Sequence, residues 1–479
     1  MPYGLPDPIE TGHFPALAGR TVLQIIPNLD AGGAERTTID IAAALNDVGA
    51  RALVACEGGR LVSELQACGG VWIPFPAGTK NPFRMLFNIR RLAALIAHER
   101  IDIVHARSRA PAWVALTATR AMRTPFITTY HGAYSGTSRV KISYNSVMAR
   151  ADYVIANSDF TRRRILSAHP FAEGKITVIP RGTDFRAFSP ASVDPVRVRR
   201  LRQDWGVEPE ERIVLLAARI TGWKGQGVLV DAAALMKQRG FTNTKFILAG
   251  DAQGRTSFVQ ELQARIAKAG LQDTVKLVGH CDDMPAAFLA ASAVAVASTE
   301  PEAFGRSAVE AQAMGAPVVV TDLGAVPETV LAPPDVEPQD RTGWRIAPDS
   351  AQALADALAE ALSLGATERD ALAARARPCR TELFARPDVP PHPGAVRKRD
   401  SCATIVLIRH LQPIAKVDFR PDKNDSYQWV RPVMKTGLEA SKCPGPAYSL
   451  KEFRHSPSNE STCGPPERWP PDQSRHPRQ

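Results

Sequence analysis

Short apolar runs alternate with helix-like stretches along this chain, and the alternation occurs twice, which restricts the possible folds more than any other feature. An apolar run of about four to eight residues bounded by turn residues is typical of a buried strand. Strands that alternate with helices favour a parallel sheet covered on both faces. Pro180, Pro190 and Pro195 interrupt the pattern in mid-chain. The sequence therefore predicts an α/β protein, in which a linker joins two doubly wound sheets with a ligand cleft at their strand ends.

The expected elements of each half can be given by residue range. In the first half the expected strands are 21–26, 52–55, 71–73, 101–105, 126–130, 153–156 and 176–179, with helices at 34–48, 84–98 and 158–168 among others. In the second half the expected strands are 212–217, 245–249, 275–278, 291–297 and 317–320, with helices at 306–314, 351–364 and 368–377.

The stretch from Ser298 to Gly315 carries the strongest chemical signal. It joins two expected strands, and two acids, Glu302 and Glu310, lie on either side of the turn into its helix. A carboxylate, a glycine that lets backbone approach a ligand and the free N–H groups of a helix N-terminus together suit hydroxyls and phosphate. For Glu302 alone, a solvated acid in an ordinary turn is an equally good interpretation.

Three further positions suit a ligand at the ends of parallel strands. Gly32 and Gly33 precede the first helix, where backbone amides can close on an anion or a sugar, although such a pair is also an ordinary turn. His131 follows the strand at 126–130 and should lie at the cleft, unless it is a structural histidine. Arg219 and Lys224 lie between a strand and the next helix, where two cations can bind a diphosphate.

These motifs together resemble family 4 of the retaining nucleotide-sugar glycosyltransferases, which have two facing Rossmann-like, doubly wound domains (the GT-B fold). The resemblance rests on Glu302 and Glu310 at the spacing Glu-x7-Glu, on the Ala-x-Gly-x-Pro that follows, and on the Arg219–Lys224 step. Ala218 and Ala303 stand where the family often has glycine, and residues 181–184 depart from its Asn-Gly-Val-Asp. The similarity covers residues 20–377.

The resemblance implies a role for each of these residues. Glu302 and His131 would be catalytic, Glu310 would bind ribose, and Ala303, Phe304 and Gly305 would contact the donor sugar. The donor diphosphate would be held by Arg219, Lys224, Gly32 and Gly33. It also implies sugar transfer with retention and without metal or cofactor, from a UDP- or GDP-linked donor. In agreement, the sequence contains no Asp-x-Asp of the metal-dependent transferases.

Charge divides unevenly over the segments expected from the resemblance. These are an extension at 1–19, an acceptor-side domain at 20–185, a nucleotide-sugar domain at 186–377 and a tail at 378–479. The net charge of +10 splits into +7 (21 − 14) for 1–185, −3 (21 − 24) for 186–377 and +6 (17 − 11) for 378–479. A basic first half suits an anionic membrane surface or a phosphorylated acceptor, although solubility explains it equally well. Arginines are not interleaved with aromatics, so we expect no nucleic-acid partner.

Location and membrane contact follow from other features. Seven cysteines without metal-ligand spacing suit a reducing cytoplasm, and we recognise no secretory signal or membrane span. The segment 83–92 mixes Met85, Leu86, Phe87 and Ile89 with arginines. It can lie on a membrane surface or pack as a helix on the sheet.

The tail has a composition unlike the rest. Residues 378–479 hold 16 of the 39 prolines and four of the seven cysteines. We predict that this tail is largely disordered, and that the closing helix expected of the family is missing, which would loosen domain closure.

Three functions remain open at this stage. The first is a glycosyltransferase that acts on a glycan or glycolipid acceptor in lipopolysaccharide or other cell-envelope synthesis. The second is a nucleotide-sugar 2-epimerase, which would need no acceptor. The third is a non-catalytic sugar-nucleotide-binding protein, if the tail prevents closure.

Overall fold

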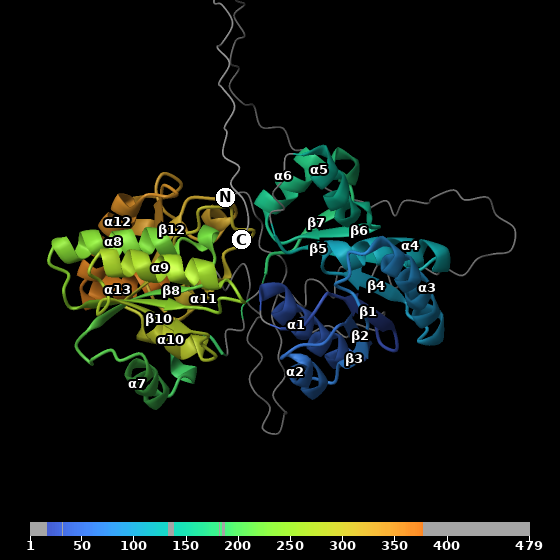
Figure 1. Ribbon diagram of the computed structural model, residues 1–479, viewed down its shortest axis with the longest axis horizontal. Helices are drawn as coiled ribbons and strands as arrows, with labels where there is room; N and C mark the ends of the chain where they lie inside the picture. The colour runs from blue at the N-terminus through green and yellow to red at the C-terminus, as the bar shows by residue number, and fades with distance from the viewer. Residues whose placement is uncertain (1–16, 31, 133–137, 182, 184–186, 377–479) are drawn as a thin grey trace, which may run out of the picture. The chain divides into compact units, whose positions relative to one another are not determined.

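The computed structural model describes residues 17–30, 32–132, 138–181, 183 and 187–376. Figure 1 colours these residues along the chain. The predicted tail at 378–479 and most of the extension at 1–19 lie outside them, so the expected disorder and the missing closing helix stay predictions.

The first half forms a seven-stranded parallel sheet in the order β3-β2-β1-β4-β5-β6-β7. Its strands are β1 Thr21–Ile25, β2 Arg51–Cys56, β3 Val71–Pro74, β4 Ile103–Ala106, β5 Phe126–Tyr130, β6 Tyr153–Ala156 and β7 Ile176–Val178. Its helices are α1 Gly33–Asp47, α2 Val62–Ala67, α3 Pro82–His98, α4 Arg109–Met122, α5 Arg139–Asn145 and α6 Asp159–Ala168. Every residue of β1 and β5 is buried, because helices cover both faces: α1 and α2 on one, α3 and α4 on the other.

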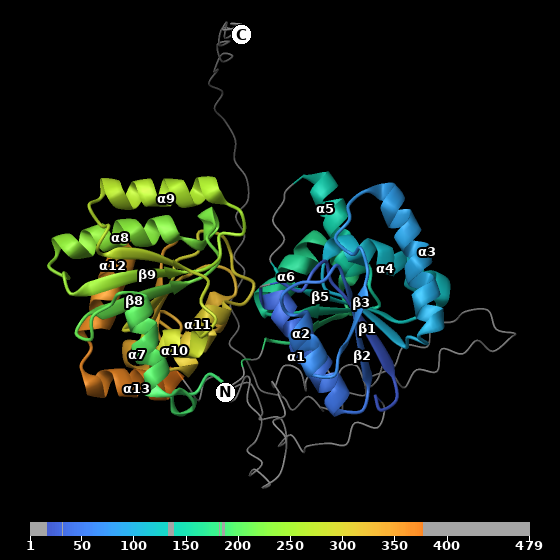
Figure 2. The ribbon, with the colours of Figure 1, turned by 60° about the horizontal axis from the view of Figure 1, so that its bottom comes forward.

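The second half forms a six-stranded parallel sheet in the order β10-β9-β8-β11-β12-β13. Its strands are β8 Arg212–Ala217, β9 Thr244–Ala249, β10 Val275–Gly279, β11 Ala293–Val296, β12 Val318–Thr321 and β13 Trp344–Ile346. Its helices are α7 Pro195–Asp204, α8 Gln226–Gln238, α9 Thr256–Lys268, α10 Met284–Ala290, α11 Arg306–Ala313, α12 Ala351–Ser363 and α13 Ala366–Ala376. As Figure 2 shows, α8 and α9 lie on one face of the sheet and α10 and α11 on the other. The predicted fold class is confirmed.

Both sheets place their loops for ligand binding at equivalent points. In each, the strand order reverses direction in mid-sheet, between β1 and β4 and between β8 and β11. Ligands of open α/β sheets bind beyond the carboxyl ends of the strands at this reversal. The loops that leave these four strands contain Gly32 and Gly33, Arg107, Arg219 and Glu302.

Two elements differ from the sequence expectation. Residues from Pro195 onward form α7 and are not part of a linker, because a proline at the first helical position costs no hydrogen bond. Asp194 caps this helix by accepting a hydrogen bond from the Val196 backbone N–H at 2.8 Å. The edge strand β13 was not expected either, because three residues are too few to show a strand pattern.

None of the helices in the described ranges combines the length and apolar character needed to cross a bilayer.

Candidate active site

A cavity of about 1070 Å³ is lined by loops from the carboxyl ends of both sheets. All ten residues singled out from the sequence line it: Gly32, Gly33, His131, Arg219, Lys224, Glu302, Ala303, Phe304, Gly305 and Glu310. They come from positions almost 280 residues apart, and the fold brings them around one space.

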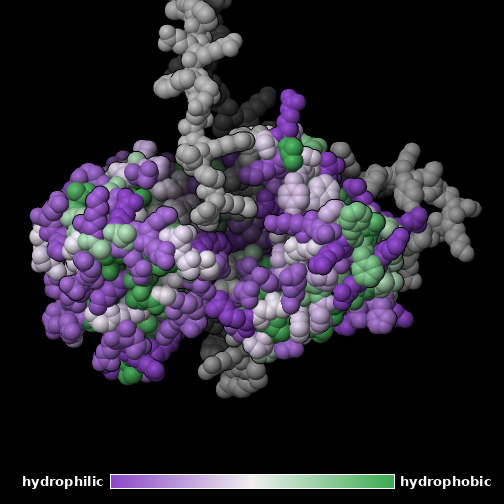
Figure 3. Space-filling view, in the orientation of Figure 1, coloured by the Kyte–Doolittle hydropathy of each residue, from purple (hydrophilic) through white to green (hydrophobic). Residues whose placement is uncertain are grey.

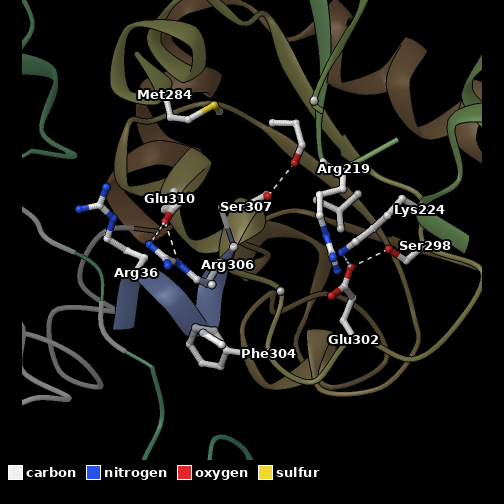
Figure 4. Close-up of a pocket in the computed structure, with 18 of the residues that line it drawn as sticks. Arg36, Arg219, Lys224, Met284, Ser298, Glu302, Phe304, Arg306, Ser307 and Glu310 are labelled. Atoms are coloured by element: carbon white, nitrogen blue, oxygen red, sulfur yellow. Dashed lines mark hydrogen bonds and ion pairs between the residues drawn. The ribbon is translucent and has the colours of Figure 1, made fainter. Parts of the chain in front are cut away.

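Glu302 lies in a cluster of cations and hydroxyls. Its carboxylate forms an ion pair with Lys224 and accepts a hydrogen bond from Ser298 Oγ at 2.7 Å. Both side chains of the ion pair are mostly buried, which strengthens their attraction. Figure 4 shows the Arg219 and Lys224 side chains extending together toward Glu302. The cluster thus holds two cations and one anion, so one positive charge is available to a ligand.

The short loop that carries Lys224 is held against β11 by a glycine. Gly225 has φ 77°, in the left-handed region, and a Cβ atom there would lie 1.8 Å from the Ala297 carbonyl oxygen. Only a glycine permits both the conformation and this close approach. The backbone therefore fixes Lys224 close to the end of the strand that leads to Glu302.

Helix α11 presents its N-terminus and Glu310 to the same cavity. Gly305, with φ 83°, is the N-cap, and no side chain caps the helix. Glu310 is buried and accepts hydrogen bonds from Arg306 Nε at 3.0 Å and Nη2 at 2.7 Å (Figure 4). Glu310, which is predicted to bind the ribose, is thus paired with Arg306 one helical turn away, at the i,i+4 spacing.

The loop between Glu302 and α11 is also fixed through its backbone. The backbone carbonyl oxygen of Ala303 accepts a hydrogen bond from Ser158 Oγ at 2.8 Å. Phe304 is 4% exposed and lies with Val309 in a small apolar cluster. The three residues predicted to contact the donor sugar are therefore held rigidly at the cavity wall.

On the first sheet, His131 lies against Arg181. Arg181 Nη2 is 2.5 Å from His131 Nδ1. A guanidinium can only donate, so Nδ1 must accept and the ring proton of neutral His131 is on Nε2. Burial, together with the nearby charges of Arg107 and Arg181, holds the pKa of His131 well below its ordinary value. His131 is therefore a neutral imidazole with an Nε2–H donor at neutral pH.

Comparison with known proteins agrees with this geometry. Residues 31–186 match the model of Glycosyltransferase Family 4, and residues 198–378 match that of Glycosyl transferases group 1. A glycosyltransferase from Rickettsia africae has a similar structure, with a TM-score of 0.70 and 31% identity over 83% of this chain and 98% of that one. The chain belongs to glycosyltransferase family 4.

Other similar proteins include one whose structure was solved with ligands. HepE of Anabaena, solved in complex with UDP and glucose, is similar to this glycosyltransferase with a TM-score of 0.68 and 27% identity, over 82% of this chain and 98% of that one. Two curated relatives are a D-inositol 3-phosphate glycosyltransferase of Jonesia denitrificans and the lipopolysaccharide core biosynthesis mannosyltransferase LpsB of Rhizobium meliloti. The first is 31% identical over 42% of this chain and 50% of its own length. The second is 34% identical over 44% and 56%. The glycosyltransferase thus spans about half the length of these relatives.

Three cavity or near-cavity residues of the glycosyltransferase escaped the sequence analysis. Arg306 could have been found from its i,i+4 spacing to Glu310. Arg107 directly follows β4, just as His131 directly follows β5. The reasoning that predicted His131 from its place at a strand end therefore applies equally to Arg107. Arg181 stands where the family pattern has asparagine, so the pattern itself predicts no role for an arginine there. Its contact with His131 joins positions 50 residues apart, which no local pattern reveals.

No group of three or more His, Cys, Asp or Glu side chains suited to a metal ion occurs in the part of the chain that the structure describes.

Proposed function

We propose that this glycosyltransferase moves a hexose, with retention and without a metal, from a UDP- or GDP-linked donor to a hydroxyl of a glycan or glycolipid. The observation that carries the proposal is the cluster of Arg219, Lys224 and Glu302 beside the N-terminus of α11. The UDP complex of the similar HepE structure supports a nucleotide-linked donor.

In the proposed reaction the bond between the sugar and the diphosphate breaks, and its electrons stay on phosphate. Arg219, Lys224 and the backbone N–H groups at Gly33 and Gly305 would stabilise that charge. The acceptor oxygen forms the new bond to the same sugar carbon, and the hydroxyl proton leaves to the departing phosphate. Glu302 would hold sugar hydroxyls and steady the positive character at the reacting carbon. Glu310 would bind the ribose hydroxyls.

His131 would act as a hydrogen-bond donor. Its Nε2–H can reach toward a sugar oxygen or a developing negative charge, because Nδ1 already accepts from Arg181. We assign no carboxylate as a nucleophile, since no residue is identified on the ring face opposite the leaving group.

Helix α3 supports a peripheral position at a membrane. Phe83 is 84% exposed, and Leu86 and Phe87 are also exposed, while Leu92 and Ile96 of the same helix are buried in the core. The helix therefore both packs on the sheet and offers an apolar surface, which Figure 3 shows over α3. Arg84 and Arg90 flank this surface and would attract anionic lipid. We propose that α3 contacts the inner face of a cell membrane, where a glycolipid of envelope or lipopolysaccharide synthesis would be the acceptor, as the name of the relative LpsB suggests.

A ligand screen followed by a transfer assay tests the proposed function. A UDP- or GDP-sugar at 100 times its dissociation constant should stabilise the full chain by about 2.7 kcal/mol, which thermal unfolding can measure. The stabilising donor is then incubated with and without a glycolipid extract, and transferred sugar is measured.

Each result of this assay has a distinct meaning. Transfer that depends on the extract supports the proposal. Conversion of the donor to an epimer without extract would indicate the 2-epimerase. Binding without turnover with any acceptor would indicate a non-catalytic protein, and absence of stabilisation by every sugar nucleotide would contradict the nucleotide site itself.

A further inference from the structure

The carboxyl edge of the first sheet holds two arginines that the proposed donor site does not use. Arg107 directly follows β4, and Arg181 follows β7. Arg107 is 2% exposed and is the largest of the fully buried side chains among the described residues. A guanidinium buried to this extent normally has an acid as its hydrogen-bond partner.

Arg107 lacks such a partner. Its Nη1 donates to the Gln24 side-chain oxygen at 3.0 Å, while Nε and Nη2 have no hydrogen-bond partner among the described residues. Nε of Arg181 is likewise buried without a partner there. Several strong donors of one small region therefore point at no acceptor, which is costly unless a ligand supplies one.

The surroundings of the two arginines are positive. Burial and the charge of Arg181 lower the pKa of Arg107 to about 9, and burial and the charge of Arg306 lower the pKa of Arg181 to about 10. Glu35 and Asp40 oppose this repulsion at both arginines, and Glu302 opposes it at Arg181. The charge of Arg181 thus raises the cost of keeping Arg107 charged in the absence of an anion, and the charge of Arg306 does the same for Arg181.

Arg181 connects this region to the cavity. It lines the cavity and contacts His131, and its Nη1 lies only 2.6 Å from where a Cβ of residue 33 would be. Gly33 is thus small enough to let the guanidinium lie against the N-terminus of α1, whose free N–H groups add to the positive field. Arg181 therefore lies at the cavity wall, whereas Arg107 is buried behind it.

We propose that Arg181, backed by Arg107, binds an anionic group of the acceptor, either a carboxylate or a phosphate. This inference rests on the proposed function and names the acceptor class: a hydroxyl compound that carries a negative charge near the hydroxyl to be glycosylated. The arginines lie on the sheet opposite Arg219 and Lys224, which leaves those two cations for the donor. A guanidinium such as that of Arg181 can donate two parallel hydrogen bonds to a planar carboxylate or to phosphate.

The test uses the full chain saturated with UDP, so that the diphosphate position is filled. Binding of glucose, glucuronate and glucose 6-phosphate is then measured by calorimetry. We expect at least one of the anionic sugars to bind about tenfold or more tightly than glucose, and the stronger of the two distinguishes a carboxylate acceptor from a phosphate acceptor.

Variants decide whether these arginines cause the preference. Arg107→Met and Arg181→Gln should each reduce it to less than about threefold, while UDP affinity stays within about twofold. The exposed Arg120→Met, on α4, is the matched control and should change nothing. Because a charge without an acceptor is removed, Arg107→Met should melt at the same or a higher temperature than the unaltered chain.

Three results would overturn the inference: equal binding of neutral and anionic sugars, a parallel loss of UDP affinity in both variants, or a lower melting temperature of Arg107→Met with the preference intact. The first and third would leave the proposed function standing, provided that UDP binds the unaltered chain. Failure of UDP to bind would instead contradict the proposed function itself.

Discussion

Lys224 and Glu302, 78 residues apart in sequence, form an ion pair at the wall of the cavity. In the proposed reaction the two residues serve different parts of one donor, since Lys224 stabilises the departing phosphate and Glu302 holds the sugar. Their contact places these two parts of the reaction next to each other before any substrate arrives.

Lys224→Met should therefore reduce turnover by about 10²–10³-fold, as loss of a charge-stabilising donor does in other enzymes. Steady-state transfer from the identified sugar nucleotide measures this. Lys237→Met, on the exposed side of α8, is the control. An unchanged kcat with a raised KM would show that Lys224 binds the donor but does not stabilise the transition state.

Glu310→Gln should weaken UDP binding by about 10–100-fold, the range for loss of hydrogen bonds to a charged group. Calorimetry with UDP and with its 2′,3′-dideoxy analogue distinguishes a ribose contact from a general effect. The preference for UDP over the analogue should shrink in this variant and persist in the exposed control Glu261→Gln. A preserved preference in Glu310→Gln would exclude the ribose role.

Phe83→Ser combined with Phe87→Ser should reduce binding to vesicles of anionic lipid by at least about 100-fold, since each exposed ring contributes about 1.5–3 kcal/mol when buried. Co-sedimentation measures the bound fraction. Phe171→Ser, at an exposed phenylalanine outside α3, is the control. Binding that is equal for all variants, or that ignores lipid charge, would rule out α3 as the contact.

Stability should fall as the pH drops below about 6.5. Burial holds the pKa values of His105 and His131 well below their ordinary value, so the unfolded chain takes up protons in this range before the folded chain does. Each histidine should contribute a slope of up to about 1.4 kcal/mol per pH unit. Urea unfolding between pH 5 and pH 8 measures it. His105→Gln should flatten the profile, and an unaltered profile would mean that His105 is not buried as a neutral ring.

Gly225→Ala should destabilise the chain by at least about 1–3 kcal/mol, the strain of a left-handed residue, with a further loss from overlap with the Ala297 carbonyl oxygen. Gly240→Ala separates the two effects, because Gly240 has φ 87° but nothing within 4 Å of its would-be Cβ. Urea unfolding should show the larger loss at residue 225. Equal losses would mean that the loop before α8 moves freely.

Strands were predictable where local composition alone determines them. The expected ranges 126–130, 153–156 and 212–217 coincide with β5, β6 and β8. A short run of apolar residues bounded by polar turns is too short for most helices and is typical of a buried strand. The edge strand β13 is three residues long and could not be recognised, since so short a segment has no pattern. Pro195 was wrongly assigned to the linker, because proline is common both in linkers and at the first position of a helix.

The candidate site was predictable in its acids and cations but not in their pairing. The spacing of Glu302 and Glu310 and the step from Arg219 to Lys224 are local, so they could be read directly. The ion pair of Lys224 with Glu302 and the contact of Arg181 with His131 depend on which strand ends meet. That information resides in the strand order of the two sheets, which the sequence pattern does not specify.

The two acids predicted to bind the donor already have cations beside them, Lys224 for Glu302 and Arg306 for Glu310. The hydroxyls of a sugar nucleotide entering the cavity would therefore meet acids that are already paired with cations of the protein. When the product leaves, each acid can pair again with the cation beside it, so the resting arrangement of the cavity forms again from the protein's own side chains.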